Sequence, residues 1–339
     1  MNEVQQQTTP VDQVQTASAN LVQGALSAWE FDSYSIYQVG ADLGGEAYLL
    51  ATVDGTYALF DTGFAFCAEQ TLNNIYAITG GAPVDLIVLT HSHYDHCSAT
   101  GYLLEHMPRA QVVASEYAAY VFTRPGAYKT MRELNTCRAQ EKGEGDHYVD
   151  VYDNIPVHVV VKDGDTFMVG NMEFQAISAV GHTKCCMAYW CAHEGLLVST
   201  ETAGVPCVSI PQSVAVPDDV HYMIDLIELI SFRSALEHIE RLRELPTRVY
   251  VSPHYGVLVG AEIDDMWVSE GFWADFIRDF VVGRYEQGQS VEEIIAAYKD
   301  IFYWGGTSPY QPEAAFDINV SYAIPTIIRD YCGEEKSSS

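Results

Sequence analysis

The chain has 339 residues, of which 48 % are apolar, so it can bury a large core as one domain or as one domain with an appendage. Lys and Arg total 17 against 46 Asp and Glu, which gives a formal charge of −29. Such a surface repels phosphate backbones and anionic lipids, so we expect neither nucleic acid nor a membrane as a partner.

The first 20 residues are polar, lack Lys and Arg, and contain no apolar stretch. This composition is unlike a secretory signal and predicts a flexible N-terminal arm over residues 1–30. No run approaches the roughly 18 apolar residues that a membrane helix requires. The eight cysteines include no CxxC pair, so we expect free thiols in a cytoplasmic protein.

The N-terminal half predicts strands that alternate with helices. Residues 61–64 (DTGF) lead from a group of three strands into a helix, and VDLIVLT (84–90) is typical of a strand buried on both faces. Residues 123–150 are polar and contain glycines, which predicts an inserted excursion outside the core. The predicted strands are 34–40, 46–53, 56–60, 84–90 and 111–115, and the predicted helices are 66–79 and 98–107.

The C-terminal half begins with strands and ends in helices. The strands-then-helices order occurs twice across residues 34–253, which predicts two packed sheets flanked by helices. A helical extension follows from about residue 262. The predicted strands are 158–164, 167–170, 172–179, 187–192, 196–200 and 247–253, and the predicted helices are 219–244, 264–288, 290–302 and 313–331.

The strongest functional signal is the segment THSHYDHCSA (90–99), directly after the buried strand. It contains the pattern HxHxDH, formed by His91, His93, Asp95 and His96. Alternate residues of an extended segment project to one side, so His91 and His93 can share one ion while Asp95 and His96 turn toward a second. Imidazole and carboxylate groups suit Zn or Fe. The alternative, a turn of solvated histidines, requires three of the 11 histidines to fall within six residues by accident.

Three further candidate ligands follow predicted strands far away in the sequence. His182 lies in GHTK after the strand 172–179, Glu201 lies in STET after LLVST, and His254 lies in SPHYG after TRVYV. Each of them alone is an ordinary residue. Together, three acid or imidazole groups at three strand ends support one another as members of a metal site.

The order HxHxDH, GHT, a strand-end acid and a strand-end His resembles the metallo-β-lactamase superfamily of binuclear hydrolases over residues 34–256. The resemblance implies an α/β fold, an αββα sandwich with two metal ions at one edge. It implies that His91, His93 and His182 hold the first ion, and that Asp95, His96 and His254 hold the second. The acid at Glu201 would bridge both ions, and Asp61 of DTGF would support a ligand histidine.

One position departs from the pattern of this family, which normally has Gly-Asp where the chain has Thr200-Glu201. Glu is one methylene longer, so the bridge is retained in a displaced position, becomes terminal on one ion, or is lost. Zinc is the metal we expect, with Fe or Mn as alternatives that the same ligands allow.

The resemblance divides the chain into a metallo-β-lactamase-fold domain over 31–260, a helical extension over 261–333 and a disordered tail over 334–339. The extension is similar to the helices of glyoxalase II-like thioesterases and of lactonases, where they cover the metal site. Most aromatic residues of the extension are expected in its core. The tip Trp304-Gly305-Gly306 is a candidate to reach the metals. The expected aromatic residues are Trp267, Phe272, Trp273, Phe276, Phe280, Tyr285, Phe302, Tyr303, Trp304 and Tyr310.

The leading hypothesis is hydrolysis of an ester, thioester or lactone of a small molecule by water that two metal ions activate. Asp95 is the expected proton acceptor. The Tyr255 phenol either donates to a developing oxyanion or, as the simpler interpretation, is a rim residue. We expect Cys185 and Cys186 to pack rather than coordinate, and the family resemblance allows a homodimer. The alternatives are a non-haem di-iron redox enzyme of this fold and a metal-bound effector with vestigial hydrolysis.

Overall fold

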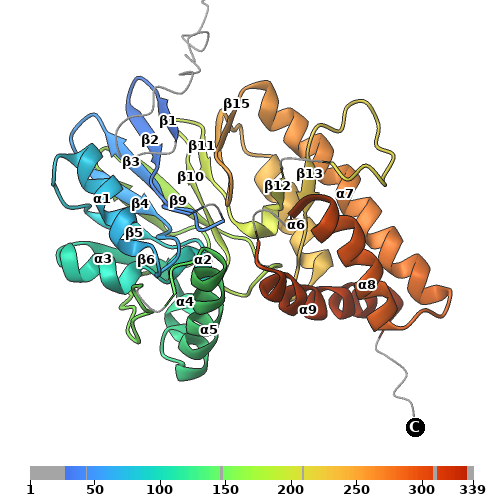
Figure 1. Ribbon diagram of the computed structural model, residues 1–339. Coiled ribbons are helices and arrows are strands. Elements are labelled where there is room, and N and C mark those ends of the chain that lie inside the picture. Colours follow the sequence, from blue (N-terminus) through green and yellow to red (C-terminus); the bar gives the residue numbers. More distant parts are fainter. Residues whose placement is uncertain (1–26, 43, 146–147, 208–209, 308–310, 334–339) are drawn as a thin grey trace, which may run out of the picture.

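The computed structural model describes residues 27–42, 44–145, 148–207, 210–307 and 311–333. Two sheets face each other in the middle of the molecule, and helices cover both outer faces (Figure 1). The expected αββα sandwich with a C-terminal helical region is confirmed. Residues 1–26 of the expected arm, the expected tail 334–339 and Tyr310 lie outside the described residues.

The first sheet contains seven strands in chain order. Its first four strands are antiparallel, and β4 to β7 run parallel, as expected for strands joined by helical crossovers. The strands are β1 (Ser27–Glu30), β2 (Tyr34–Gln38), β3 (Tyr48–Thr52), β4 (Tyr57–Phe60), β5 (Leu86–Val88), β6 (Gln111–Ser115) and β7 (Val159–Val161).

The second sheet contains six strands in the order β15-β14-β11-β10-β9-β8, in which only β11 and β14 pair in parallel. A separate antiparallel ribbon, β12 with β13, lies beside this sheet, next to helix α7. The strands are β8 (Thr166–Val169), β9 (Met172–Ser178), β10 (Met187–Cys191), β11 (Leu196–Val198), β12 (Val205–Cys207), β13 (Met223–Asp225), β14 (Val249–Val251) and β15 (Val257–Val259).

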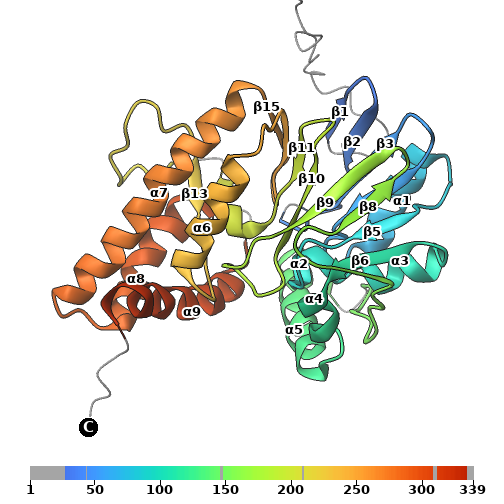
Figure 2. The same cartoon turned by 180° about the vertical axis from the view of Figure 1, so that it is seen from behind.

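The helices form two groups that follow the chain. Figure 2 shows α1 to α5 against the first sheet and α6 to α9 beyond the second. The helices are α1 (Ala68–Thr79), α2 (Tyr94–Cys97), α3 (Thr100–His106), α4 (Glu116–Val121), α5 (Pro125–Glu141), η1 (Glu201–Ala203), α6 (Phe232–Arg243), α7 (Ala261–Glu286), α8 (Val291–Phe302), η2 (Tyr303–Thr307) and α9 (Glu313–Cys332). Within the described ranges, no helix is both long enough and apolar enough to cross a membrane.

Three apolar cores hold these layers together. The core between the sheets contains Phe60, whose ring centroid lies 5.4 Å from that of Phe174 and 6.1 Å from that of Tyr189. Each such side chain, fully buried, contributes about 1.5–3 kcal/mol to folding. A second core lies under α1 to α5, and a third joins the second sheet to α6–α9. Most of the aromatic residues predicted for the extension belong to this third core.

Three segments differ from the sequence prediction. Residues 27–30, assigned to the arm, form β1 and pair with β2. The polar segment 123–150 contains α5, whose buried Tyr128 and Met131 join the core under the first sheet. Pro125 at the first position favours this helix start. The segment 219–244, predicted to be a helix, is only partly helical. Its first part contains β13, which pairs with β12, and α6 starts after the Ser231 cap.

Candidate metal centre

Strand register brings the first candidate ligands to one end of the first sheet. Phe60 of β4 pairs with Val88 of β5, so Asp61 lies beside the segment 89–91 that leaves β5. The chain then turns at His93, whose extended backbone precedes the short helix α2. This helix carries Asp95 and His96, so the whole HxHxDH pattern lies within one strand-to-helix turn.

Register in the second sheet brings the remaining candidates to the same edge. Ser178 of β9 pairs with Met187 of β10, and His182 lies in the loop between them. Val198 of β11 pairs in parallel with Val251 of β14, so the segments that follow these strands leave the sheet side by side. Glu201 and His254 belong to these two segments, three residues beyond each pair.

The seven residues form two groups of potential metal donors that share Glu201. The first group contains His91, His93, His182 and Glu201, and the second contains Asp95, His96, His254 and Glu201, with the potential ligand atoms of each group within 4.8 Å of one another.

The Glu201 carboxylate divides its oxygens between the groups. Its Oε2 atom lies 3.2 Å from His91 Nε2 and 3.7 Å from His93 Nδ1, and it also contacts His182 Nε2. Its Oε1 atom lies 2.7 Å from His254 Nε2 and 3.6 Å from His96 Nε2. The longer acid therefore reaches both groups, which is the arrangement a bridging ligand requires.

The other ring nitrogen of three histidines is held by a hydrogen-bonding partner outside the groups. His91 Nδ1 lies 3.1 Å from Thr90 Oγ1, and His182 Nδ1 lies 2.5 Å from the carbonyl oxygen of Ile227. His96 Nδ1 lies 2.8 Å from Asp61 Oδ2. Such bonds orient an imidazole and leave Nε2 for a metal. The Nε2 atoms of His182 and His96 lie within the donor groups. His182 Nε2 is 2.9 Å from His93 Nδ1, and His96 Nε2 is 3.1 Å from His254 Nε2.

The burial of the candidate donor side chains fits a site that holds cations. His91 and His96 are fully buried, and His182 and His254 are 3 % and 5 % exposed. His91 Nε2 and Glu201 Oε2 lie 3.2 Å apart, but neither atom makes a hydrogen bond of good geometry. Burial, together with the neighbouring His96, holds the pKa of His91 well below its usual value, so this ring is a neutral electron-pair donor. Converging buried donors of this kind are costly unless a cation satisfies them, and the donor set fits two divalent ions.

Asp61 fixes the turn from which the first ligands project. Its Oδ1 accepts the Thr90 backbone N–H at 2.8 Å, and its Oδ2 accepts the Thr90 hydroxyl at 2.7 Å as well as contacting His96. Burial lowers the pKa of His96, but the charges of Asp95 and Asp61 outweigh this and raise it well above its usual value. Asp61 has a φ of 56°, a left-handed conformation that Asp tolerates better than most residues.

We expect the Asp61→Asn variant to bind metal about 10–100-fold more weakly than the wild type, because the amide lacks the charge that stabilises His96 and one of the acceptors. Asn tolerates the same left-handed backbone, so the change isolates the carboxylate. Competition with a chromophoric chelator measures the affinity. Asp32→Asn, an exposed aspartate between β1 and β2, is the matched control. Equal affinities in the three proteins would remove the supporting role of Asp61.

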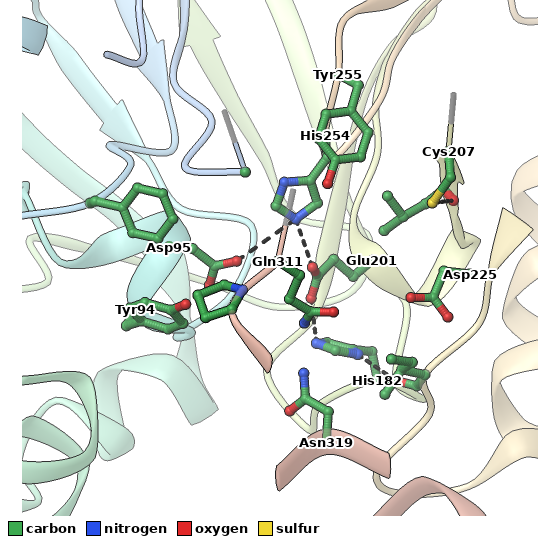
Figure 3. A pocket seen from close by; sticks show the side chains of 15 residues that line it. Tyr94, Asp95, His182, Glu201, Cys207, Asp225, His254, Tyr255, Gln311 and Asn319 are labelled. Carbon is green, nitrogen blue, oxygen red and sulfur yellow. Dashed lines mark hydrogen bonds and ion pairs between the residues drawn. The ribbon is translucent and has the colours of Figure 1, made fainter. Parts of the chain in front are cut away.

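A pocket of about 570 Å³, including its open mouth, lies beside the two groups. Figure 3 shows side chains from three parts of the chain around it: the first sheet, the second sheet and the C-terminal helices. The lining residues are Gly44, Phe64, Tyr94, Asp95, His182, Glu201, Val205, Cys207, Asp225, Ile227, His254, Tyr255, Gln311, Pro312 and Asn319.

Tyr255 lines the pocket directly beside His254. Its φ of 68° is left-handed, and its backbone N–H donates to Glu46 Oε1 at 3.1 Å. The next amide, that of Gly256, donates to the Tyr48 hydroxyl at 2.9 Å. These bonds hold a strained turn in place beside the site. Burial raises the pKa of the Tyr255 phenol well above its usual value, so the group stays protonated and can donate.

Some pocket residues escaped the sequence analysis. Gln311, Pro312 and Asn319 come from the start of α9 and the residues before it, whereas Trp304 and Gly305 do not line the pocket. Trp304 is 58 % exposed, and Gly305 packs near Pro211, so the structure does not place these two residues of the tip at the pocket. Asp225 was missed because its segment was assigned to a helix. No sequence signal separates it from the other acids of this chain.

The cysteines near the site do not join either donor group. Cys185 and Cys186 are each 1 % exposed, and Cys185 Sγ lies 3.2 Å from Ser92 Oγ. Burial raises the pKa of the Cys186 thiol to about 12, so this side chain remains a thiol at neutral pH. The described cysteines are all free.

Comparison with known proteins bears on the family and the fold. Residues 40–254 match the family model described as "Metallo-beta-lactamase superfamily". A beta-lactamase domain protein from Burkholderia ambifaria superposes with a TM-score of 0.59 at 16 % identity, covering 92 % of this chain and 91 % of that one. A metallo-beta-lactamase family protein from Thermus thermophilus gives 0.56 at 18 % identity, covering 87 % and 89 %. At such identities, these likenesses concern the fold alone.

A curated relative is similar over a shorter stretch. The chain is 25 % identical over 112 residues to the protein named Glyoxylase B2 from Dictyostelium discoideum. The matched stretch covers 33 % of this chain and 33 % of that protein, so it spans a third of the relative's length.

Proposed function

The chain belongs to the metallo-beta-lactamase superfamily, and from this premise we propose that it is a dinuclear metal-dependent hydrolase that cleaves an ester, thioester or lactone of a small molecule. The observation that carries the proposal is the position of Glu201, whose two oxygens face two different sets of donors. A single-ion site would need only one of these sets. A bridging acid beside a pocket is what a two-ion hydrolase requires.

The residues of the chain have distinct roles in this proposal. His91, His93 and His182 would hold one ion, Asp95, His96 and His254 the other, and Glu201 both. Bound divalent ions would supply an activated water and polarise the scissile carbonyl group. Zinc fits the histidine-rich donor set, with Fe and Mn as alternatives.

Asp95 and Tyr255 carry the proton chemistry of this proposal. Asp95 lines the pocket, and its Oδ2 lies 3.7 Å from His96 Nε2 and 3.8 Å from His254 Nε2. From this position, it accepts the proton of the attacking water. The protonated phenol of Tyr255, on the pocket wall, donates a hydrogen bond to the developing oxyanion.

The choice of an acyl substrate is supported by the pocket wall and by one relative. Gln311, Pro312 and Asn319 of the C-terminal region line the pocket, in keeping with the glyoxalase II-like arrangement that the sequence resembles. The stretch similar to Glyoxylase B2 is in keeping with the same branch.

The proposal is tested by elemental analysis together with a panel of esters, thioesters and lactones. We expect about two ions per chain and turnover of at least one of the three classes. His254→Ala should lose one ion and most of the turnover, while His193→Ala, whose side chain is 94 % exposed, should retain both. A metal-loaded protein that cleaves none of the three classes would contradict the proposal. A coloured or paramagnetic protein active with dioxygen would favour the di-iron alternative.

A further inference from the structure

Asp225 is a buried carboxylate on the pocket wall that the two donor groups do not use. It ends β13, where it pairs with Val205 of β12, and it is 7 % exposed. Its Oδ1 atom has no hydrogen-bond partner. Burial, reinforced by the charge of Glu201, raises the pKa of Asp225 to about 7. A buried oxygen without a hydrogen-bond partner leaves this acid poorly compensated on the pocket wall.

The pocket offers negative charge without a basic side chain. Among the described residues that line it there is no Lys and no Arg, while Asp95, Glu201 and Asp225 all contribute to its wall. Asp95 and Glu201 belong to the donor groups and would be neutralised by metal ions. Asp225 lies on the far side of Glu201 from Asp95, next to Cys207 (Figure 3). An anionic substrate would meet a carboxylate at this wall with no counter-charge from the chain.

A third metal ion does not explain Asp225. The groups of three or more His, Cys, Asp or Glu residues that can hold an ion, within the described part of the chain, do not include it. An organic cation has other requirements, because one carboxylate, amide oxygens and aromatic faces suffice to bind it. The pocket provides the amides of Gln311 and Asn319 and the ring of Tyr255, whereas Tyr94 lies beside Asp95 on the other side of Glu201 (Figure 3).

We propose that Asp225 binds an ammonium group of the substrate, so that the site selects small esters, thioesters or lactones that carry a positive charge. The inference rests on the proposed hydrolase function and specifies its substrate class. Asp225 positions the charged end of the substrate, so that the ester carbonyl of the substrate lies at the donor groups. The same carboxylate disfavours substrates with a carboxylate or phosphate at that end.

The test compares three p-nitrophenyl esters with the metal-loaded protein. The acyl groups are a butanoyl chain with a terminal trimethylammonium group, its neutral isostere with a terminal tert-butyl group, and glutaryl. We expect kcat/KM for the cationic ester to exceed that for the neutral isostere about tenfold or more, mainly through KM, and to exceed that for the glutaryl ester further.

The variant Asp225→Asn, nearly isosteric, should abolish the preference for the cationic ester, measured as the ratio of kcat/KM for the cationic and the neutral ester. Asp219→Asn removes an equal charge from an exposed position of the segment before β13 and should retain the wild-type preference. An equal loss for all three esters in Asp225→Asn would overturn the inference, because it indicates a structural or proton-donating role. A wild type without the preference overturns it too, whatever the variant does.

A binding measurement separates this inference from the proposed function. Calorimetry of the metal-loaded protein with butylammonium ion and with butanol should show binding of the cation only, about tenfold weaker or more in Asp225→Asn. Binding of the cation together with inertness toward every ester would contradict the proposed reaction but support the cation site. Hydrolysis without a preference for the cationic ester and without binding of butylammonium would support the proposed reaction but contradict the cation site.

Discussion

Replacing Glu201 with alanine lowers the bound metal from about two ions per chain to about one or fewer and reduces kcat/KM about a thousandfold. The reason is the shared position of its carboxylate, since one oxygen contacts His91 and His182 while the other lies 2.7 Å from His254 Nε2. Removing it deprives both donor groups of their only common member. Elemental analysis and steady-state kinetics on the same preparation measure the two effects.

Glu201→Asp refines this expectation. Its carboxylate is withdrawn by about 1.5 Å, one carbon–carbon bond, so it keeps contact with one donor group and weakens contact with the other. We expect an intermediate metal content and rate. Glu173→Gln, an exposed acid on β9, is the control for loss of a charge. Two ions and full activity in Glu201→Ala would show that the two donor groups bind metal without a shared acid.

Removal of the metal by a chelator lowers the melting temperature of the protein by several degrees and abolishes hydrolysis. Four donors follow strand β5 of the first sheet, namely His91, His93, Asp95 and His96. The other three follow strands of the second sheet, namely His182, Glu201 and His254. Ions held by both sets tie the two sheets together at one edge. Binding at a hundredfold excess over the dissociation constant stabilises the native state by about 2.7 kcal/mol.

Differential scanning calorimetry of chelated and reconstituted protein measures this shift. His91→Ala is the control variant. Because it lacks one metal donor, the chelator should lower its melting temperature less than that of the wild type. Re-addition of zinc should restore the melting temperature and turnover together. A melting temperature that is the same with and without metal would show that the sheets are held at this edge by the protein alone.

The fold and the donor set were accessible from the sequence because strand ends carry a local signal. A buried strand such as 84–90 is recognisable from its continuous apolar run, and the His-rich turn follows it directly. Long-range register was not accessible in the same way. Whether the longer side chain of Glu201 reaches one donor group or both depends on the parallel pairing of Val198 with Val251, which no local pattern encodes.

The pocket wall was harder to predict than the metal centre. Asp225 lies in an apolar segment whose pattern favours a helix, but pairing with β12 makes it a strand. Tertiary contacts override local preference in such short elements. Residues 311–319 bear no recognisable motif, and the packing of α9 against its neighbouring helices, among them α7, α8 and α6, places Gln311 and Asn319 at the pocket.

The start of α9 supplies one wall of the pocket, whereas the candidate metal donors all precede it in the sequence. Part of the pocket wall is therefore encoded in a stretch of the chain separate from the donors, whereas Asp225 lies between the donors Glu201 and His254. Recombination that exchanges only the residues beyond His254, and that keeps the apolar surface beneath those helices covered, retains every candidate metal donor and so changes the substrate range without removing the cleavage reaction.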